Sequence, residues 1–263
     1  MIYIQKRRTP VAVKQCADKI ISAPESHYKE IELPKDAKKL RSLFDQMPKA
    51  AISEALCQEQ HGLCAYCMRR IVSQGYTSMR IEHYRALSRN KALALDYQNY
   101  LGVCNGGEKE NTVKPHVLCC DAARSEIELI INPWNKRQME AIAYKRNGQI
   151  FVKDDVGLDR QLVKDMQDDI DDVLVLNGIR DKKGNVKHDT STRLIANRRS
   201  TYESVTRQFE RWSKKNCLTS DYLKEQIDLL ENQLKGTADA MEFIGVRLYF
   251  YKEKYKRLKR QGK

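Results

Sequence analysis

Four pieces of sequence between Cys64 and Asp121 decide the fold of this chain. They read C-A-Y-C at 64–67, R-I-E-H-Y at 80–84, D-Y-Q-N-Y-L-G-V-C-N at 96–105 and H-V-L-C-C-D at 116–121. Two thiols separated by two residues, with further thiols downstream, are typical of a tetrahedral zinc site whose ligands come from separate pieces of chain. The spacing therefore predicts a zinc ion that holds this region together.

The identity of the last zinc ligand is open from the spacing alone. Cys64, Cys67 and Cys104 are the first three candidates. Cys119 and Cys120 compete for the fourth position, because adjacent residues do not both reach one tetrahedral ion with good geometry. His116 is a further alternative to a thiol. Four thiolates would leave no open position on the ion, which predicts a structural role for the zinc.

An acid and an imidazole, Glu82 and His83, stand between the two groups of cysteines, at the end of the alternating run Met79-Arg80-Ile81. A histidine beside a carboxylate can serve as a general base for water when oxygen ligands hold a hard cation nearby. A single histidine in a strand is more often structural, and His83 is also an alternative zinc ligand. Its position between the cysteine groups nevertheless favours hydrolytic chemistry.

At these residues the chain resembles the HNH endonuclease family, and more narrowly the PtuB-like HNH proteins of Septu-type and retron-associated antiviral systems. The motifs that carry the resemblance are Gln60-His61-Gly62-Leu63-Cys64-Ala65-Tyr66-Cys67, Ile81-Glu82-His83, Leu95-Asp96-Tyr97-Gln98-Asn99, Asn99-Tyr100-Leu101-Gly102-Val103-Cys104, Cys104-Asn105-Gly106-Gly107, Cys120-Asp121 and Ile131-Asn132-Pro133. The chain departs from the family in an insertion from Asn105 to Cys119, and in Asp121, where the family has His or Asn.

The resemblance implies an α+β fold with a central, zinc-stabilised ββα-metal finger flanked by mainly helical regions. We expect an N-terminal arm and helical lead-in over residues 1–60, the nuclease core over 61–135, and a hairpin followed by a mainly helical, basic region over 136–263. Since the family places its metal-binding residue directly after the last zinc cysteine, the resemblance selects Cys120, together with Cys64, Cys67 and Cys104, as the zinc ligands.

The resemblance also assigns roles in catalysis. Glu82 and Asp121 would hold a catalytic Mg²⁺ or Mn²⁺, with Asp96 or Asn105 as alternatives to Asp121. His83 would be the general base, and Asn99 would open a helix and hold the loop that carries His83. Arg85 or Arg124 would clamp the neighbouring phosphate.

The implied function is hydrolysis of nucleic-acid phosphodiesters. DNA is the favoured substrate, and RNA, for example transfer RNA, is the alternative. The implied partners are an ATPase of the same defence system and, in retron systems, a reverse transcriptase with its RNA-DNA product. A zinc-stabilised nucleic-acid-binding scaffold without catalysis is the alternative function, because Asp121 in place of His or Asn, together with the long insertion, departs from the family pattern.

Composition agrees with a polyanion partner. The chain carries 48 Lys and Arg against 35 Asp and Glu, a net charge of +13. Neutralising phosphates with such cations releases counterions and favours binding of DNA or RNA alike. No run approaches the roughly 20 apolar residues of a membrane span, and the N-terminal charges follow a short apolar run, which is the wrong order for a signal peptide. We therefore expect a cytoplasmic protein, in which C-x-x-C indicates metal before disulfide.

Periodicity predicts the remaining elements. Helices are expected at 36–47, 49–60, 158–176, 193–212, 221–235 and from about 238 to the C-terminus, where the last one becomes strongly basic. A hairpin is expected over 64–80 with Gln74-Gly75 near its turn, and another over 141–152 around Asn147-Gly148. Residues 99–103 are expected to begin the α element of the finger, and 178–190 to form a charged loop.

Overall fold

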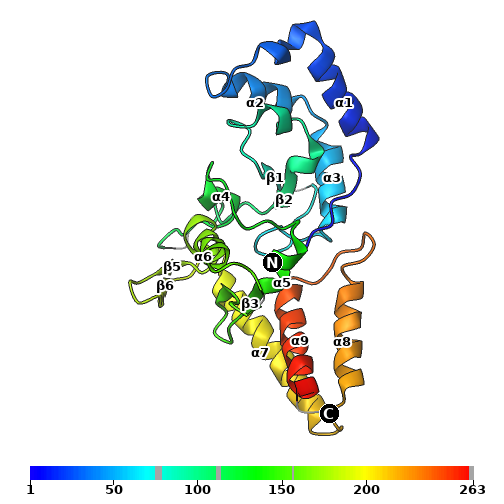
Figure 1. The fold of residues 1–263 in the computed structure, drawn as a ribbon, viewed down its shortest axis with the longest axis vertical. Coiled ribbons are helices and arrows are strands. Elements are labelled where there is room, and N and C mark those ends of the chain that lie inside the picture. Colours follow the sequence, from blue (N-terminus) through cyan, green and yellow to red (C-terminus); the bar gives the residue numbers. More distant parts are fainter. Residues whose placement is uncertain (75–78, 111–113, 156, 261–263) are drawn as a thin grey trace.

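The computed structural model describes residues 1–74, 79–110, 114–155 and 157–260. These residues form an α+β fold in which helices dominate and the strands pair into three separate two-stranded antiparallel sheets. Figure 1 shows three levels along the long axis, with the N-terminal helices at one end, the small sheets in the middle and a group of long helices at the other end. The α+β prediction is confirmed.

The N-terminal level contains α1 (Val11–Ser22), α2 (Ala37–Asp45) and α3 (Lys49–Glu59), with short 3-10 turns at Pro24–Ser26 and Tyr28–Glu30. The helices predicted at 36–47 and 49–60 are confirmed, whereas α1 was not predicted. The apolar stripe of α2, Leu40, Leu43 and Phe44, is buried. It faces the central sheet, since Phe44 contacts residues of both central strands.

The central sheet joins β1 (Arg80–His83) to β2 (Tyr100–Val103), with Glu82 opposite Leu101 and His83 opposite Tyr100. One of the predictions is wrong here. Residues 100–103 form a strand instead of beginning a helix, because the aromatic and branched side chains Tyr100, Leu101 and Val103 fit a buried strand. The predicted turn of the hairpin over 64–80 falls at Gly75, outside the described residues, while on its flanks Leu63 bridges Arg70 and the Met79 N–H donates to the Val72 carbonyl at 3.0 Å.

The outer edge of β2 is paired by a side chain. Gln60, directly after α3, donates from Nε2 to the Gly102 carbonyl at 2.7 Å and accepts from the Gly102 N–H at 2.7 Å. A Cβ on Gly102 would lie 2.7 Å from the Met79 side chain. Glycine therefore lets the strand approach its neighbours while one amide satisfies its edge, which fixes α3 against the central sheet.

The rest of the chain is mainly helical. Its elements are α4 (Asp121–Arg124), α5 (Lys136–Ala141), β3 (Ile142–Tyr144), β4 (Ile150–Val152), α6 (Arg160–Asp168), a π-helical turn (Asp169–Val173), β5 (Ile179–Arg180), β6 (Val186–His188), α7 (Leu194–Ser213), α8 (Ser220–Asn232) and α9 (Ile244–Arg260). The hairpin around Asn147-Gly148 and the predicted helices are confirmed, the first of these helices ending in the π-helical turn. The predicted loop over 178–190 instead contains the short pair β5 and β6.

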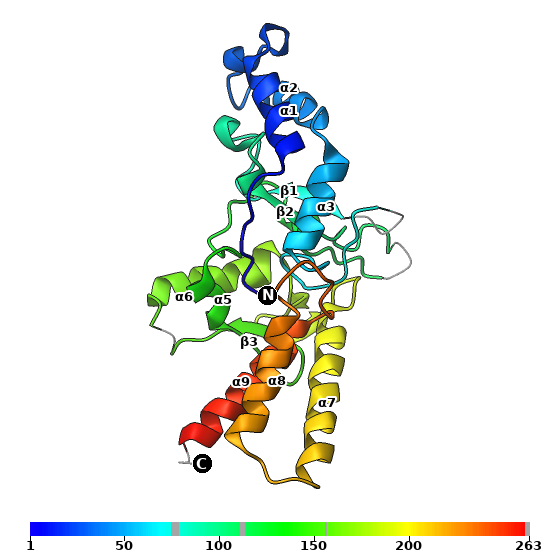
Figure 2. The same ribbon diagram turned by 90° about the vertical axis from the view of Figure 1, so that its right-hand side faces the viewer.

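Helices α7, α8 and α9 run side by side and project from the middle level, as both views show (Figures 1 and 2). We call them the helical stalk. Apolar side chains hold them together, among them Val205, Phe209, Leu223, Leu230 and Phe250. Thr219 begins α8 by accepting a hydrogen bond from the Tyr222 N–H at 3.2 Å. No helix in the described ranges is long and apolar enough to cross a membrane.

Candidate zinc centre and the adjoining polar site

Four buried thiols meet between the central strands and the turn that precedes α4. The Sγ atoms of Cys64, Cys67, Cys104 and Cys120 all lie within 4.8 Å of one another. Cys64 and Cys120 are 4.0 Å apart, and Cys67 and Cys104 are 3.7 Å apart. Zinc–sulfur bonds of about 2.3 Å in a tetrahedron place the sulfurs roughly 3.8 Å apart. These four residues therefore fit a zinc ion, as predicted.

Local backbone geometry brings the thiols together. Cys64 and Cys67 lie in a tight turn in which the Met68 N–H donates to the Cys64 carbonyl at 3.1 Å. Cys104 directly follows β2. Cys120 has a positive φ of 56°, and its N–H donates to the Leu174 carbonyl at 2.9 Å. The last ligand is thus positioned by a contact from the C-terminal part of the chain.

The two alternatives for the fourth position point elsewhere. The Cys119 Sγ lies 3.5 Å from both the Gly106 carbonyl oxygen and the Thr192 hydroxyl. His116 Nε2 lies 2.8 Å from the Gly107 carbonyl oxygen. Hydrogen bonds from the neighbouring thiols, that of Cys119 first, lower the pKa of Cys104 well below its usual range. Cys119 therefore adjoins the cluster without belonging to the tetrahedral set.

Glu82 and Arg124 form a buried ion pair beside the thiols. Arg124 donates from Nη1 to Glu82 Oε1 and from Nη2 to the Tyr84 carbonyl at 2.6 Å. The predicted phosphate clamp at Arg124 is wrong, because this residue is only 1% exposed and its guanidinium is used inside the protein. Burial raises the pKa of Glu82 to about 8, although Arg124 favours the ionised form.

One carboxylate oxygen of Glu82 is not used by the protein. Its Oε2 atom is buried and has no hydrogen-bond partner of good geometry among the described residues, although the Tyr66 hydroxyl lies close enough to favour the ionised form of the carboxyl and lower its pKa. Asp121, the first residue of α4, is close enough for its charge to contribute to the raised pKa of Glu82. Burial raises the pKa of Asp121 as well, against the attraction of Arg80, whose Nη1 lies 3.9 Å away. The two acids are thus near enough to influence each other, with Glu82 buried and Asp121 partly exposed.

The two alternatives to Asp121 as a cation ligand already accept hydrogen bonds from nearby backbone groups. Asp96 accepts from the Gln98 N–H at 2.9 Å and caps a 3-10 turn, and Asn105 accepts from the Gly107 N–H at 3.3 Å. Both side chains serve their own turns. Asp121 therefore remains the better second carboxylate beside Glu82.

His83 follows Glu82 in β1 and consequently points to the opposite side of the sheet. Its ring packs edge-on against Phe44 and Tyr100, with centroids 4.4 and 5.0 Å away, and the residue is only 7% exposed. The sequence predicts an open imidazole that converges with two carboxylates. The structure corrects this expectation, because α2 covers the ring.

The protonation of His83 is fixed by its surroundings. Nε2 lies 2.9 Å from the Ala94 carbonyl oxygen. A carbonyl only accepts, so Nε2 carries the proton of the neutral ring and the lone pair is on Nδ1. Burial lowers the pKa of His83 to about 4, which keeps the ring neutral at neutral pH. The imidazole is thus neutral and fixed in orientation, and it is a weak base in these surroundings.

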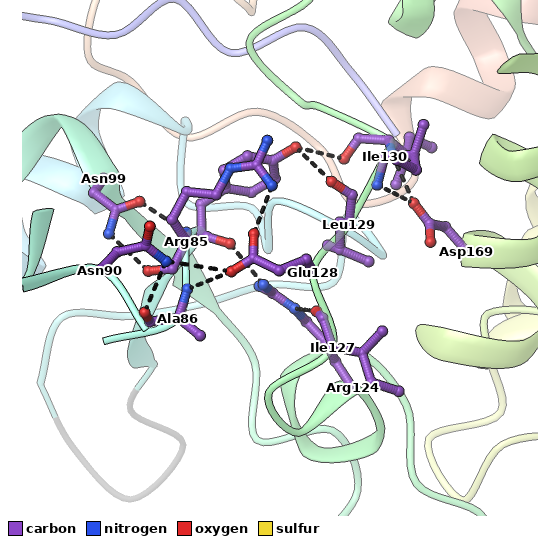
Figure 3. Close-up of polar contacts among 12 residues, drawn as sticks. Arg85, Ala86, Asn90, Asn99, Arg124, Ile127, Glu128, Leu129, Ile130 and Asp169 are labelled. Atoms are coloured by element: carbon purple, nitrogen blue, oxygen red, sulfur yellow. Dashed lines mark hydrogen bonds and ion pairs between the residues drawn. The ribbon is translucent and has the colours of Figure 1, made fainter. Parts of the chain in front are cut away.

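The chain after His83 is held by two polar side chains (Figure 3). Asn99 accepts from the Arg85 N–H at 2.8 Å and donates to the Arg85 carbonyl at 3.0 Å. Glu128 accepts from the Ala86 N–H at 3.2 Å and from Arg85 Nη1 at 2.5 Å. Asn99 therefore lies where it can hold the loop behind His83, although it precedes a strand instead of a helix.

Glu128 and Asp169 were missed by the sequence reasoning. Asp169 accepts from the N–H groups of Ile130 and Ile131 at 2.6 and 2.7 Å, which anchors the segment that carries Glu128 (Figure 3). The only signal for Glu128 is an acid between two apolar residues, Ile127 and Leu129. Asp169 has no local signal, because its partners are about 40 residues away in sequence.

The chain matches no protein-family model, and no curated protein is similar to it in sequence. The function is therefore inferred from the contacts of the residues themselves. Those contacts show a set of four thiols that fits zinc and, next to it, a polar site with one unused carboxylate oxygen.

Proposed function

We propose that this chain is a metal-dependent endonuclease of the HNH type, which hydrolyses nucleic-acid phosphodiesters. The observation that carries the proposal is the buried Oε2 of Glu82, which has no hydrogen-bond partner of good geometry among the described residues and adjoins a second acid, Asp121. A buried carboxylate oxygen without a hydrogen-bond donor is costly unless a ligand completes it. A divalent cation is the ligand that a pair of acids favours.

The two metal sites would differ in chemistry. The four thiols would hold zinc with no open position, so that the zinc stabilises the fold. Glu82 and Asp121 are oxygen ligands of the kind that suits Mg²⁺ or Mn²⁺. When bound, such a cation would stabilise charge on the scissile phosphate and on the departing oxygen.

The protein's own groups would position and deprotonate the attacking water. The resemblance assigns this proton transfer to His83, whose available nitrogen is Nδ1 because Nε2 is used by the Ala94 carbonyl. Since α2 covers the ring on the side of β1 opposite Glu82, the role would require α2 to move away when the substrate binds. Asn99 and Glu128 would keep the following loop in place. Arg85, whose side chain is 44% exposed, would contact the neighbouring phosphate by exchanging its ion pair with Glu128.

The biological setting is part of the proposal through the resemblance to Septu-type and retron-associated proteins. DNA is the favoured substrate, and RNA such as transfer RNA is the alternative within the same chemistry. An ATPase of the same system would direct the cut, joined in retron systems by a reverse transcriptase with its RNA-DNA product. The net charge of +13 supports a nucleic-acid substrate without selecting between DNA and RNA.

The test is cleavage of plasmid DNA and of transfer RNA with Mg²⁺ or Mn²⁺, with and without the ATPase partner. His83→Ala should lower the rate by about 10²- to 10⁴-fold, the usual contribution of a general base. His116→Ala is the matched control, since this histidine lies outside the thiol set, and it should cleave like the wild type. Zinc content should be unchanged in both variants. Equal rates for wild type and His83→Ala would overturn the proposal.

A second candidate function is a zinc-stabilised nucleic-acid-binding scaffold without catalysis. The observation that favours it is the burial of His83 between Phe44 and Tyr100, on the opposite side of β1 from Glu82. Absence of cleavage by the wild type under every condition above, together with retained binding of nucleic acid, would select the scaffold.

A further inference from the structure

A groove separate from the polar site lies between the N-terminal arm (residues 1–8), α5, the end of α8 and one side of α9. Its volume is about 1260 Å³. Sites for small molecules are usually about 300 to 1,000 Å³, so the size suits an extended ligand. The groove borders the central sheet, since Glu59 and His61 line it while Gln60 between them holds Gly102 of β2.

The lining of the groove is positively charged. Nine basic and five acidic side chains line it, a net charge of +4. Some of the cations are neutralised within the groove. Lys252 pairs with Glu231 at 2.7 Å, and Lys6 pairs with Glu59 at 2.9 Å. The remaining cations are available to bind an anionic ligand.

Six of the cations have no acidic partner within 4 Å among the residues that the structure describes, and three of these six have side chains that also make no hydrogen bond there. These three are Arg8 on the arm, Lys136 at the start of α5 and Lys153 directly after β4. Burial lowers the pKa of Lys153, and the charge of Lys256 lowers it further, against the attraction of Glu253, Asp155 and Glu140. Cations from three separate segments thus line one space without a direct acidic contact. An anionic ligand would relieve their repulsion.

The groove also offers aromatic and apolar surface. Tyr3, which is 41% exposed, and Tyr249 both line it. Leu248 and Met139 add apolar area to its walls. A positively charged groove with aromatic side chains is the arrangement by which proteins bind single-stranded nucleic acid, because the backbone follows the cations and the unstacked bases lie on the rings. A paired duplex would leave these rings without bases to contact.

We propose that this groove binds a single-stranded segment of nucleic acid, with phosphates at Arg8, Lys136 and Lys153 and bases against Tyr3 and Tyr249. The inference rests on the proposed function in that the bound strand would belong to the substrate. It adds a second contact region, which would hold the strand beside the central sheet. Specificity for strand type would then be set outside the residues that cut.

The test is binding of fluorescent 20-nucleotide oligo(dT), oligo(U) and a duplex of the same length, measured by anisotropy in EDTA-free buffer without added Mg²⁺ or Mn²⁺. The triple variant Arg8→Glu, Lys136→Glu, Lys153→Glu should bind the single strands at least about tenfold more weakly and with a smaller salt dependence. The matched control Lys182→Glu, Lys183→Glu, Lys187→Glu makes the same charge change on exposed residues around β5 and β6. It should stay within about twofold of the wild type. Equal melting temperatures would show that both variants are folded.

The outcomes separate this inference from the proposed function. Single-strand binding that depends on the groove residues supports the inference even when the wild type does not cleave. Binding that is equal in the groove and control variants overturns it even when the wild type cleaves. Failure of the wild type to bind any single strand, or a preference of the groove for the duplex, also overturns it.

Discussion

The central region (residues 61–135) and the helical stalk are stabilised by different means. In the central region, strands of four residues are fixed by thiols, by the Glu82–Arg124 pair and by side chains that hold backbone groups, such as Gln60. In the stalk, long helices pack through apolar side chains, such as Leu223 and Phe250. The central region therefore adds specific thiol and polar contacts to its apolar core, whereas the stalk depends mainly on apolar packing.

This difference matters for function. Short strands held by hydrogen bonds from polar side chains can place a carboxylate and an imidazole at defined positions, whereas a packed helical bundle mainly supplies stability. Such a region should be sensitive to the loss of any single contact, first of all to the loss of a thiol.

Removal of the zinc should have the largest effect. Structural zinc contributes about 10 to 16 kcal/mol of binding free energy in zinc-finger peptides. Cys104→Ser, or a strong chelator, should therefore unfold the central region and leave the stalk helical. Hydrogen exchange of β1 and β2 compared with α8 and α9, together with zinc content, measures this. Cys217→Ser is the control, because this exposed thiol lies outside the cluster. Full stability of a zinc-free wild type would contradict the prediction.

Breaking the buried ion pair should have the next largest effect. Arg124→Met leaves the Glu82 carboxylate buried without its partner, and such changes cost about 3 to 5 kcal/mol. Denaturant unfolding followed by tryptophan fluorescence measures the loss. Arg85→Met is the control, since its pair with Glu128 is partly exposed and should contribute about 1 kcal/mol or less. Similar losses in the two variants would remove the distinction between the buried and exposed pairs.

A conservative change in the stalk should have the smallest effect. Ile244→Val removes one methyl group from a fully buried position at the start of α9 and should cost about 0.5 to 1.5 kcal/mol. Zinc content and the exchange rates of β1 should not change. Leu229→Ala, at a position that is 55% exposed, should cost less than about 0.5 kcal/mol. If Ile244→Val released zinc, the two regions would be coupled more tightly than their contacts indicate.

The sequence was sufficient to predict most of the helices and three thiols of the cluster, Cys64, Cys67 and Cys104, and the family resemblance added Cys120. The affinity of cysteine thiols for zinc is a property of the residue type, and helical periodicity is a local property of the sequence, so that both can be predicted without the fold. The hairpin around Asn147-Gly148 was predictable for the same reason, because Asn-Gly favours that turn. The division at residues 60 and 135 stays a prediction.

The surroundings of the polar site depend on contacts between distant parts of the chain. The burial of Arg124, the cover of α2 over His83 and the roles of Glu128 and Asp169 arise from residues about 40 positions apart. Residues 100–103 form a strand although the local sequence predicts the start of a helix, because they pair with β1 and because Gln60 bonds to the edge of the strand. Burial and pairing depend on what packs against a residue, and this information is not contained in its sequence neighbours.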